Sequence, residues 1–228
     1  MRLGWAVMVC VLLFAVPSGA EELTLKSQKE KLSYAIGVDM GSNFKKQSID
    51  IDPDVLVRGL KDSLSGGKVL LTDEEILAVK TAFRQEMMKK QEEERKKLSE
   101  KNTTEGDAFL AENKKKEGVK ILPSGLQYKV ITEGSGKSPK ETDTVTVNYR
   151  GTLIDGTEFD SSYKRGQPAT FPVNGVIPGW TEALQLMKEG AKWQIVIPSN
   201  LAYGEKGAGN SIGPNAVLVF EVELISVK

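Results

Sequence analysis

The spacing of apolar residues changes near residue 118, from a helical period before it to a strand period after it. In the first part, apolar residues recur every three or four positions, as on one face of an amphipathic helix. In the second part, they alternate with polar residues, as in a strand with one buried face. The pattern predicts an α+β protein with an all-α N-terminal half and a C-terminal antiparallel sheet.

Two short helices are expected first. One carries a single apolar stripe at i+4 spacing, formed by Leu32, Ile36, Met40 and Phe44. The other covers residues 54–64, with Asp52 as its N-cap and Pro53 at its first position. Ser65-Gly66-Gly67 ends it, since glycine favours a helix C-terminus.

A third, long helix is expected over 72–117. Thr72 and Glu75 form a capping box at its start. At ~1.5 Å per residue it would be about 69 Å long. Charged residues surround it over 89–101, so we interpret it as a linking helix between two modules. Whether it kinks at 102–106 stays open.

The short helices of residues 28–77 form a poor core by themselves, because so small a region buries little apolar surface. We therefore expect residues 21–71 to be a dimerisation domain, in which a second copy covers the apolar stripe. An intramolecular three-helix bundle is the alternative.

Residues 1–20 are expected to be a secretory signal peptide. Arg2 provides the positive start, and the 12 residues from Trp5 to Val16 are all apolar, a run too short to span a bilayer. Small residues then place cleavage after Ala20. Lipidation at Cys10 is not expected, because it lies early and follows a bulky residue. No second long apolar run follows, so no transmembrane span is expected after cleavage.

Residues 118–228 are expected to form an antiparallel sheet of about four to six strands wrapped on one short helix, a half-barrel. Asp155-Gly156 lies between two alternating segments and is typical of a tight turn. The helical pattern is short and follows Pro178-Gly179. The clearest strand patterns lie in 126–130, 145–149, 193–197 and 218–224.

The composition excludes several chemistries. The 228-residue chain has no histidine and one cysteine, so it has no Ser-His-Asp or Cys-His nucleophile, no histidine base and no His/Cys site for zinc or copper. Its 31 Lys and Arg balance its 31 Asp and Glu, which argues against nucleic-acid binding. Carboxylate, lysine or hydroxyl chemistry, oxygen-ligated metals and catalysis by environment alone remain.

A series of motifs in the C-terminal region resembles, in order, an FKBP-type peptidyl-prolyl isomerase domain. They are Val147-Asn148-Tyr149-Arg150-Gly151, Gly156-Thr157-Glu158-Phe159-Asp160-Ser161-Ser162, Val176-Ile177-Pro178-Gly179-Trp180, Ala202-Tyr203-Gly204, Ile212-Gly213-Pro214-Asn215 and the strand 218–224. The helical half and Leu122-Pro123-Ser124-Gly125-Leu126-Gln127-Tyr128 further resemble the macrophage infectivity potentiator branch. The resemblance then covers essentially the whole chain after the signal peptide.

This resemblance implies an exported bacterial homodimer, V-shaped and joined through its N-terminal helices, in the periplasm or associated with the outer membrane. It implies isomerisation of Xaa-Pro bonds in exported proteins, folding-chaperone activity on unfolded clients, and macrolides of the tacrolimus and rapamycin type as ligands. No cofactor and no metal are expected. The alternative is a non-catalytic holdase or peptide-binding adaptor with the same fold.

The resemblance also assigns residues. Trp180 would be the floor of the substrate pocket, Ile177 N–H and the Tyr203 hydroxyl would face substrate carbonyls, and Asp160 would face the carbonyl carbon and orient Tyr149 or Arg165. The expected catalytic residues are Asp160, Tyr149, Tyr203, Ile177 and Trp180. The expected substrate-binding residues are Phe159, Phe171, Val176, Ile212, Phe220 and Arg165.

Taken singly, Trp180 and Phe220 are typical core residues and Asp160 a typical turn residue, so the order of the motifs carries the assignment. Trp193 matches no pocket position and is interpreted as core. Ala169 stands where many relatives have an aromatic wall, with Phe171 two residues on, and the segment 205–211 has small residues. These departures bear on substrate preference and macrolide affinity more than on activity.

Overall fold

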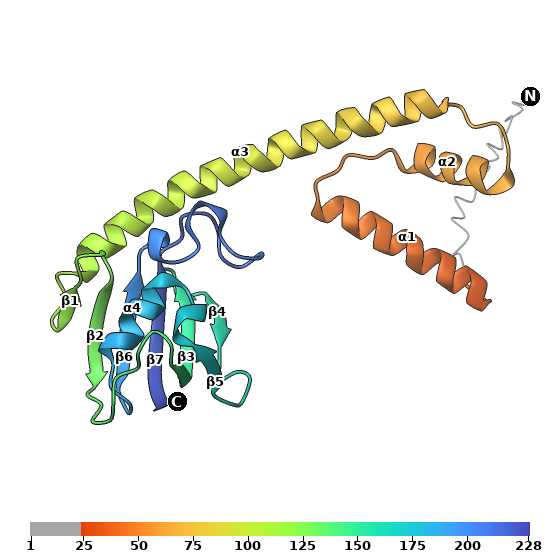
Figure 1. The fold of residues 1–228 in the computed structure, drawn as a ribbon. Helices are drawn as coiled ribbons and strands as arrows, with labels where there is room; N and C mark the ends of the chain where they lie inside the picture. The colour runs from red at the N-terminus through yellow and green to blue at the C-terminus, as the bar shows by residue number, and fades with distance from the viewer. Residues whose placement is uncertain (1–23) are drawn as a thin grey trace, which may run out of the picture. The chain divides into compact units, whose positions relative to one another are not determined.

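The structure, a computed structural model of the chain, describes residues 24–228, so the expected signal peptide lies outside the described residues. The chain divides into two compact units between residues 75 and 76. The first contains α1 (Gln28–Lys46) and α2 (Pro53–Ser65), which confirms both short helices. The second contains all but the first turn of α3 (Asp73–Asn113) and the sheet (Figure 1).

Local signals set the two ends of α2. It begins at Pro53, the predicted first position, and the Asp52 carboxylate accepts hydrogen bonds from the backbone N–H groups of Asp54 (2.9 Å) and Val55 (3.1 Å). This cap satisfies donors that have no partner inside the helix. At the other end, Gly66 has φ +64°, a left-handed conformation that glycine adopts without steric cost.

The long helix α3 is continuous through 102–106. It starts at the predicted capping box, where the Thr72 N–H donates to the Glu75 carboxylate (2.8 Å) and the Glu75 N–H donates to Thr72 Oγ1 (3.2 Å). It ends at Asn113, earlier than predicted, because turns that include Gly118 at φ +78° lead into the sheet. Within residues 24–228, no helix is long and apolar enough to cross a membrane.

The sheet is antiparallel, with the order β1-β2-β6-β7-β3-β4, and β5 pairs with β3. It has seven strands, more than the four to six predicted, because residues 119–121 and 169–172 form strands too short to show an alternating pattern. The strands are β1 (Val119–Ile121), β2 (Gln127–Thr132), β3 (Thr144–Leu153), β4 (Glu158–Ser161), β5 (Ala169–Pro172), β6 (Lys192–Ile197) and β7 (Leu218–Val227).

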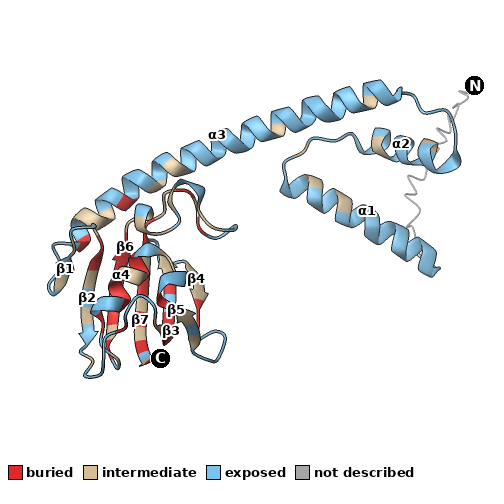
Figure 2. Ribbon diagram, viewed as in Figure 1, coloured by how far each residue is buried: buried red, intermediate tan, exposed pale blue. Residues whose placement is uncertain are grey.

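One face of the sheet packs on α4 (Pro178–Leu186), which confirms the half-barrel wrapped on a short helix. Alternate residues of β3, β6 and β7 are buried there, together with Trp180, Ala183 and Leu184 of α4. Figure 2 shows the buried residues concentrated in this sheet and helix. Trp193 is buried and stacks on Tyr128 with ring centroids 4.4 Å apart, which confirms it as a core residue.

The last turns of α3 also pack on this domain. The Asn113 side-chain amide donates to the Gln127 side-chain oxygen (2.9 Å), and the Gln127 amide donates to the Leu110 carbonyl (3.0 Å). Farther up the helix, a Cβ on Gly106 would lie 2.7 Å from Val217 Cγ2, so glycine allows the helix to approach closely. The C-terminal part of the linking helix is therefore part of the domain that it precedes.

The two faces of β7 give a test of this core. Leu224 is 0% exposed, whereas its neighbour Ile225 is 39% exposed. We expect Leu224→Ala to lower the free energy of unfolding by about 2–5 kcal/mol, because it leaves a cavity in the packed interior. Ile225→Ala is the matched control, with an expected loss below about 1 kcal/mol. Urea unfolding measures the free energy of unfolding of both variants. An equal loss for the two would contradict the assignment of Leu224 to the core.

Candidate active site

Aromatic side chains from four elements meet at Trp180, a buried residue of α4. Its ring contacts Tyr149 of β3, Phe171 of β5 and Phe220 of β7 edge-on, at centroid distances of 5.2, 6.0 and 5.3 Å. Such pairs contribute about 0.5–1.5 kcal/mol each beyond the burial of their surface. Trp180 therefore fixes the positions of three other rings around it.

The sequence around Trp180 sets its direction. Ile177 is the N-cap of α4 and Pro178 is its first residue, a position where proline's missing N–H removes no helical hydrogen bond. A Cβ on Gly179 would lie 2.5 Å from Ile197 Cγ2, so this glycine lets the start of α4 lie against β6. The helix thus presents Trp180 to the sheet within its first turn.

Phe159 of β4 extends the aromatic group, with its ring 5.5 Å from that of Phe220 at an angle of 87°. Both rings lie beside Gly151 of β3, which pairs with Phe220 in the sheet. A Cβ on Gly151 would lie 2.7 Å from Phe220 Cε1 and 2.8 Å from Phe159 Cε2. The absence of a side chain at Gly151 therefore makes room for both rings.

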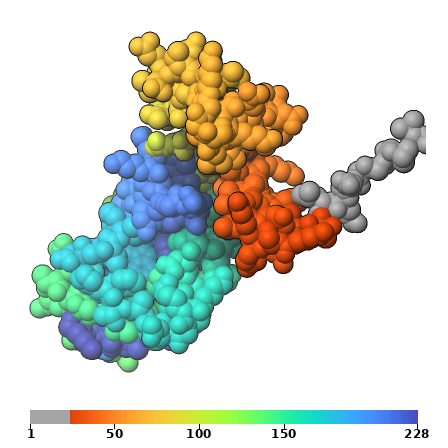
Figure 3. Space-filling model, turned by 90° about the vertical axis from the view of Figure 1, so that its right-hand side faces the viewer, coloured from red at the N-terminus to blue at the C-terminus, as the bar shows by residue number. Residues whose placement is uncertain are grey.

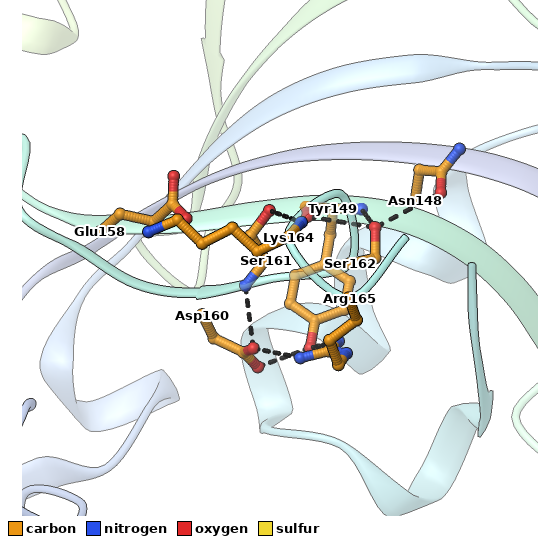
Figure 4. Close-up of polar contacts among 8 residues, drawn as sticks. All are labelled: Asn148, Tyr149, Glu158, Asp160, Ser161, Ser162, Lys164 and Arg165. Carbon is orange, nitrogen blue, oxygen red and sulfur yellow. Dashed lines mark hydrogen bonds and ion pairs between the residues drawn. The ribbon is translucent and has the colours of Figure 1, made fainter. Parts of the chain in front are cut away.

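A charged pair borders this apolar group (Figure 4). The Tyr149 hydroxyl donates to Asp160 Oδ2 (2.5 Å), and Arg165 Nη2 donates to the Tyr149 hydroxyl oxygen (2.6 Å). Arg165 Nη1 forms an ion pair with Asp160 Oδ1, and the guanidinium lies 5.2 Å from the centre of the Tyr149 ring. The Asp160 and Arg165 side chains are 42% and 44% exposed, so this edge is open to water.

These contacts set the charge states of the three groups. Burial opposes ionisation of Asp160, but hydrogen bonds from Tyr149 and Arg165 outweigh it and hold the pKa of Asp160 below its ordinary value. Burial and the hydrogen bond to Asp160 raise the pKa of the Tyr149 phenol. Near neutral pH, the edge therefore holds a carboxylate, a neutral phenol and a guanidinium.

Two serines that follow Asp160 in the sequence support this edge. The Ser161 N–H donates to Asp160 Oδ1 (2.8 Å). Ser162 is buried, its hydroxyl oxygen accepts from the Tyr149 N–H (2.9 Å), and its own N–H donates to the Tyr149 carbonyl (2.9 Å). In the sequence, only the Ser-Ser pair after Asp160 could have indicated this supporting role. The bonds themselves form because β3 lies beside this segment.

Glu158 also supports this edge, and sequence reasoning gave it no such role. Its carboxylate forms ion pairs with Lys164 (2.9 Å) and Arg150 (2.7 Å), and both cations lower the pKa of Glu158. The pairs join β4 to β3 and to the turn that carries Arg165. Two cations and a carboxylate separated along the chain give no local pattern that would indicate this.

The structure brings seven of the predicted residues into one contacting group: Tyr149, Phe159, Asp160, Arg165, Phe171, Trp180 and Phe220. Val176 and Ile177 are partly buried against the same core, and Ile212 is buried in it. Tyr203 is 42% exposed, and its hydroxyl forms no hydrogen bond with residues 24–228.

Besides the Tyr203 hydroxyl, two N–H groups near Trp180 have no hydrogen-bond partner in the described chain. One is the backbone N–H of Ile177, and the other is the indole N–H of Trp180. Ile177 is only half-buried, so its N–H is suited to meet an acceptor on a ligand, whereas the indole nitrogen of Trp180 is buried. Within residues 24–228, no group of three or more His, Cys, Asp or Glu side chains is arranged to hold a metal ion.

Comparisons with known families cover most of the chain. Residues 135–225 match the family described as FKBP-type peptidyl-prolyl cis-trans isomerase. Residues 29–130 match the domain amino terminal to FKBP-type peptidyl-prolyl isomerase.

Similar proteins agree. The outer membrane protein MIP of Legionella longbeachae is 50% identical over 100% of this chain and 98% of its own length. The peptidyl-prolyl cis-trans isomerase Mip of Coxiella burnetii is 54% identical over 90% of this chain and 89% of its own. The crystal structure of FkpA from Escherichia coli is 40% identical, with a TM-score of 0.69 over 90% of this chain and 99% of that one. The chain therefore belongs to the FKBP-type peptidyl-prolyl cis-trans isomerases, in the group that contains Mip and FkpA.

Proposed function

We propose that the Xaa-Pro bond of the substrate lies over Trp180, between the aromatic rings and the Asp160–Arg165 edge. The observation that carries this proposal is the charged network of Asp160, Arg165 and the Tyr149 hydroxyl at the border of the aromatic group. An apolar floor beside a fixed carboxylate suits a planar amide that has to twist.

The physics of amide rotation explains why such a site is sufficient. Rotation about a peptide bond has a barrier of about 18–20 kcal/mol, because the planar amide loses resonance when it twists. The twisted form has less charge separation than the planar one. A site that replaces water with apolar surface, and binds the twisted form more tightly, therefore lowers the barrier without a nucleophile or a metal.

Individual roles follow from position. Asp160 faces the substrate carbonyl carbon and holds Tyr149 and Arg165 in place. Its contacts with the Tyr149 hydroxyl and the Arg165 guanidinium support this role. The Ile177 N–H and the Tyr203 hydroxyl donate to substrate carbonyls, and the lack of a partner for either within residues 24–228 supports this. Phe171, 6.0 Å from both Tyr149 and Trp180, supplies the wall that Ala169 lacks, and Val176, Ile212, Phe159 and Phe220 complete the walls for proline or a macrolide.

Removal of the charge at Asp160 tests the site. We expect Asp160→Asn to lower kcat/KM by about tenfold to a hundredfold, because the amide keeps the size but loses the charge-assisted hydrogen bonds that order Tyr149 and Arg165. A protease-coupled assay with an Xaa-Pro peptide measures the rate.

Asp155→Asn is the matched control, since Asp155 occupies the exposed turn between β3 and β4 and asparagine is equally suited to a turn. Its rate should equal that of the wild type. Equal rates for both variants would remove Asp160 from the mechanism.

The charge states predict a flat pH profile. Asp160, with a lowered pKa, loses its charge only below about pH 4, and Tyr149, with a raised pKa, ionises only above about pH 10. The chain has no histidine to titrate between them. We expect kcat/KM to vary by less than about twofold between about pH 5.5 and 8.5, measured by NMR exchange without a protease. An inflection between about pH 6 and 8 would contradict the assigned charge states.

The same shift in Asp160 has a consequence for stability. Its lowered pKa means that the ionised network stabilises the fold above about pH 4 and that this contribution is lost as the pH falls through the folded-state pKa.

We also propose a homodimer through the N-terminal helices. Neither α1 nor α2, both within the described chain, contains a buried residue. Leu32 and Ile36 of the predicted stripe are 63% and 52% exposed. Because apolar surface in water costs about 25 cal/mol per Å², a second copy that covers this stripe would stabilise both chains. The match of residues 29–130 to the domain that precedes such isomerases supports this arrangement over an intramolecular bundle.

Charges placed in the stripe test the dimer. We expect wild type to have twice the monomer mass by light scattering and the double variant Leu32→Glu/Ile36→Glu to have the monomer mass, because buried carboxylates would oppose association. Lys45→Glu is the control, since position 45 lies on the opposite side of α1 from position 36. A monomeric wild type, or a double variant that stays dimeric, would contradict the proposal.

The cellular role that we propose is isomerisation and chaperoning of exported polypeptides in the periplasm or at the outer membrane. The apolar first segment of the sequence and the relative named outer membrane protein MIP support export. Apolar side chains outside the stripe, such as Leu64 and Leu70, are also exposed in the single chain and support contact with unfolded clients.

A further inference from the structure

Three side-chain hydrogen bonds join α3 to the loop of residues 204–215, which we name the flap loop. Arg95 Nη2 donates to the Glu205 carbonyl (2.8 Å), and the Asn102 amide donates to the Pro214 carbonyl (2.8 Å). In the other direction, the Asn215 amide donates to Ser99 Oγ (2.8 Å). All three meet the flap loop near its two ends.

The helix presents a single face to these contacts. Residues 95, 98, 99 and 102 follow the three- and four-residue spacing that places side chains on one side of a helix. Gly213 lies directly against them, because a Cβ there would be 2.9 Å from Asn102 Nδ2 and 3.1 Å from Leu98 Cδ2. Figure 3 shows the blue surface of the segment near residue 205 next to the yellow-green surface of α3.

The flap loop is closed on itself, so contacts at its ends hold the whole loop. The Asn215 N–H donates to the Gly204 carbonyl (2.8 Å), which joins the two ends. Farther along, Ala208 and Ile212 pair as an antiparallel bridge. Asn215 has φ +55°, a conformation in which a residue other than glycine is uncommon, so its position depends on these bonds.

The flap loop also belongs to the proposed site. Ile212 is buried in the cluster that contains Trp180 and Phe220, and Tyr203 directly precedes the loop. A shift of the loop would therefore move a wall of the site and one of its proposed donors together.

Beside these bonds, α3 and the loop do not pack continuously. A groove of about 870 Å³ lies between them, lined among others by Met88, Leu98, Ile154, Ile212 and Val217. Because the groove separates apolar side chains along much of the interface, the hydrogen bonds of residues 95, 99 and 102 are important for holding the flap loop against α3.

We propose that Arg95, Ser99 and Asn102 are positioning residues for the isomerase site, which act by holding the flap loop and through it Ile212 and Tyr203. On this view, the linking helix sets the shape of the substrate site as well as the distance between two modules. The inference rests on the proposed placing of Ile212 and Tyr203 at the substrate.

An isosteric change at Asn102 tests the proposal in the full chain. Asn102→Asp keeps the size but sets a carboxylate against the Pro214 carbonyl in place of a donor. We expect KM for an Xaa-Pro peptide to rise about threefold to tenfold with kcat nearly unchanged, because a loosened wall weakens binding of substrate and transition state alike. Amide hydrogen exchange should become faster in 204–215 while the rest of the domain keeps its protection.

Gln85→Glu is the matched control, since it makes the same amide-to-carboxylate change at an exposed position of the same helix that does not line the groove. A second pair covers the case in which Asn102→Asp fails to fold. Ser99→Ala removes the acceptor for Asn215 and should raise KM, whereas Ser99→Thr keeps a hydroxyl and should retain the wild-type value.

The outcomes separate this inference from the proposed site. The positioning role is wrong if every variant that folds keeps the wild-type KM and the wild-type rate of amide hydrogen exchange in the flap loop. Ser99→Ala alone decides this if Asn102→Asp does not fold. Faster exchange with an unchanged KM also overturns it, because the loop would then move without affecting substrate. An Asp160→Asn variant as active as wild type would instead count against the proposed site itself.

Discussion

The edge-on packing of Trp180 against Tyr149, Phe171 and Phe220 is the interaction on which the isomerase domain depends. It joins α4 to three strands, so the same rings close the core and form the proposed floor of the site. Because interiors are packed with few voids, these rings hold their positions before any substrate arrives. Catalysis that works by removing water from an amide requires such a preformed surface more than it requires a reactive group.

The polar edge adds one fixed charge to this surface. Asp160 lies in a strand whose neighbours supply its partners: a phenol from β3 and a guanidinium from the turn that follows β4. Each partner favours the ionised carboxylate, and the serines and Glu158 hold the supporting backbone. A chain without histidine has no group here that changes charge near neutral pH, which agrees with a reaction that transfers no proton.

The N-terminal helices α1 and α2 differ from the isomerase domain, because neither contains a buried residue within the described chain. Within residues 24–228, the apolar side chains of Leu32 and Ile36 stay more than half exposed. Along α3, most charged residues over 89–101 are exposed, while Arg95, Asn102, Gly106 and Asn113 contact the isomerase domain. One helix thereby links α1 and α2, which contain no buried residue, to a domain with a packed core.

The sequence by itself determined the local structure and the family. Caps at Asp52 and Thr72 and the period-2 runs of the longer strands predicted their elements, since caps and periodicity act within a few residues. The strands β1 and β5 were missed because three or four residues become a strand only by pairing with a neighbour. The Glu158 ion pairs, the Ser162 bonds and the contact of Asn102 with Pro214 join residues that are apart in the sequence. No local pattern reports such contacts, so which side chains complete the site was decided by tertiary packing alone.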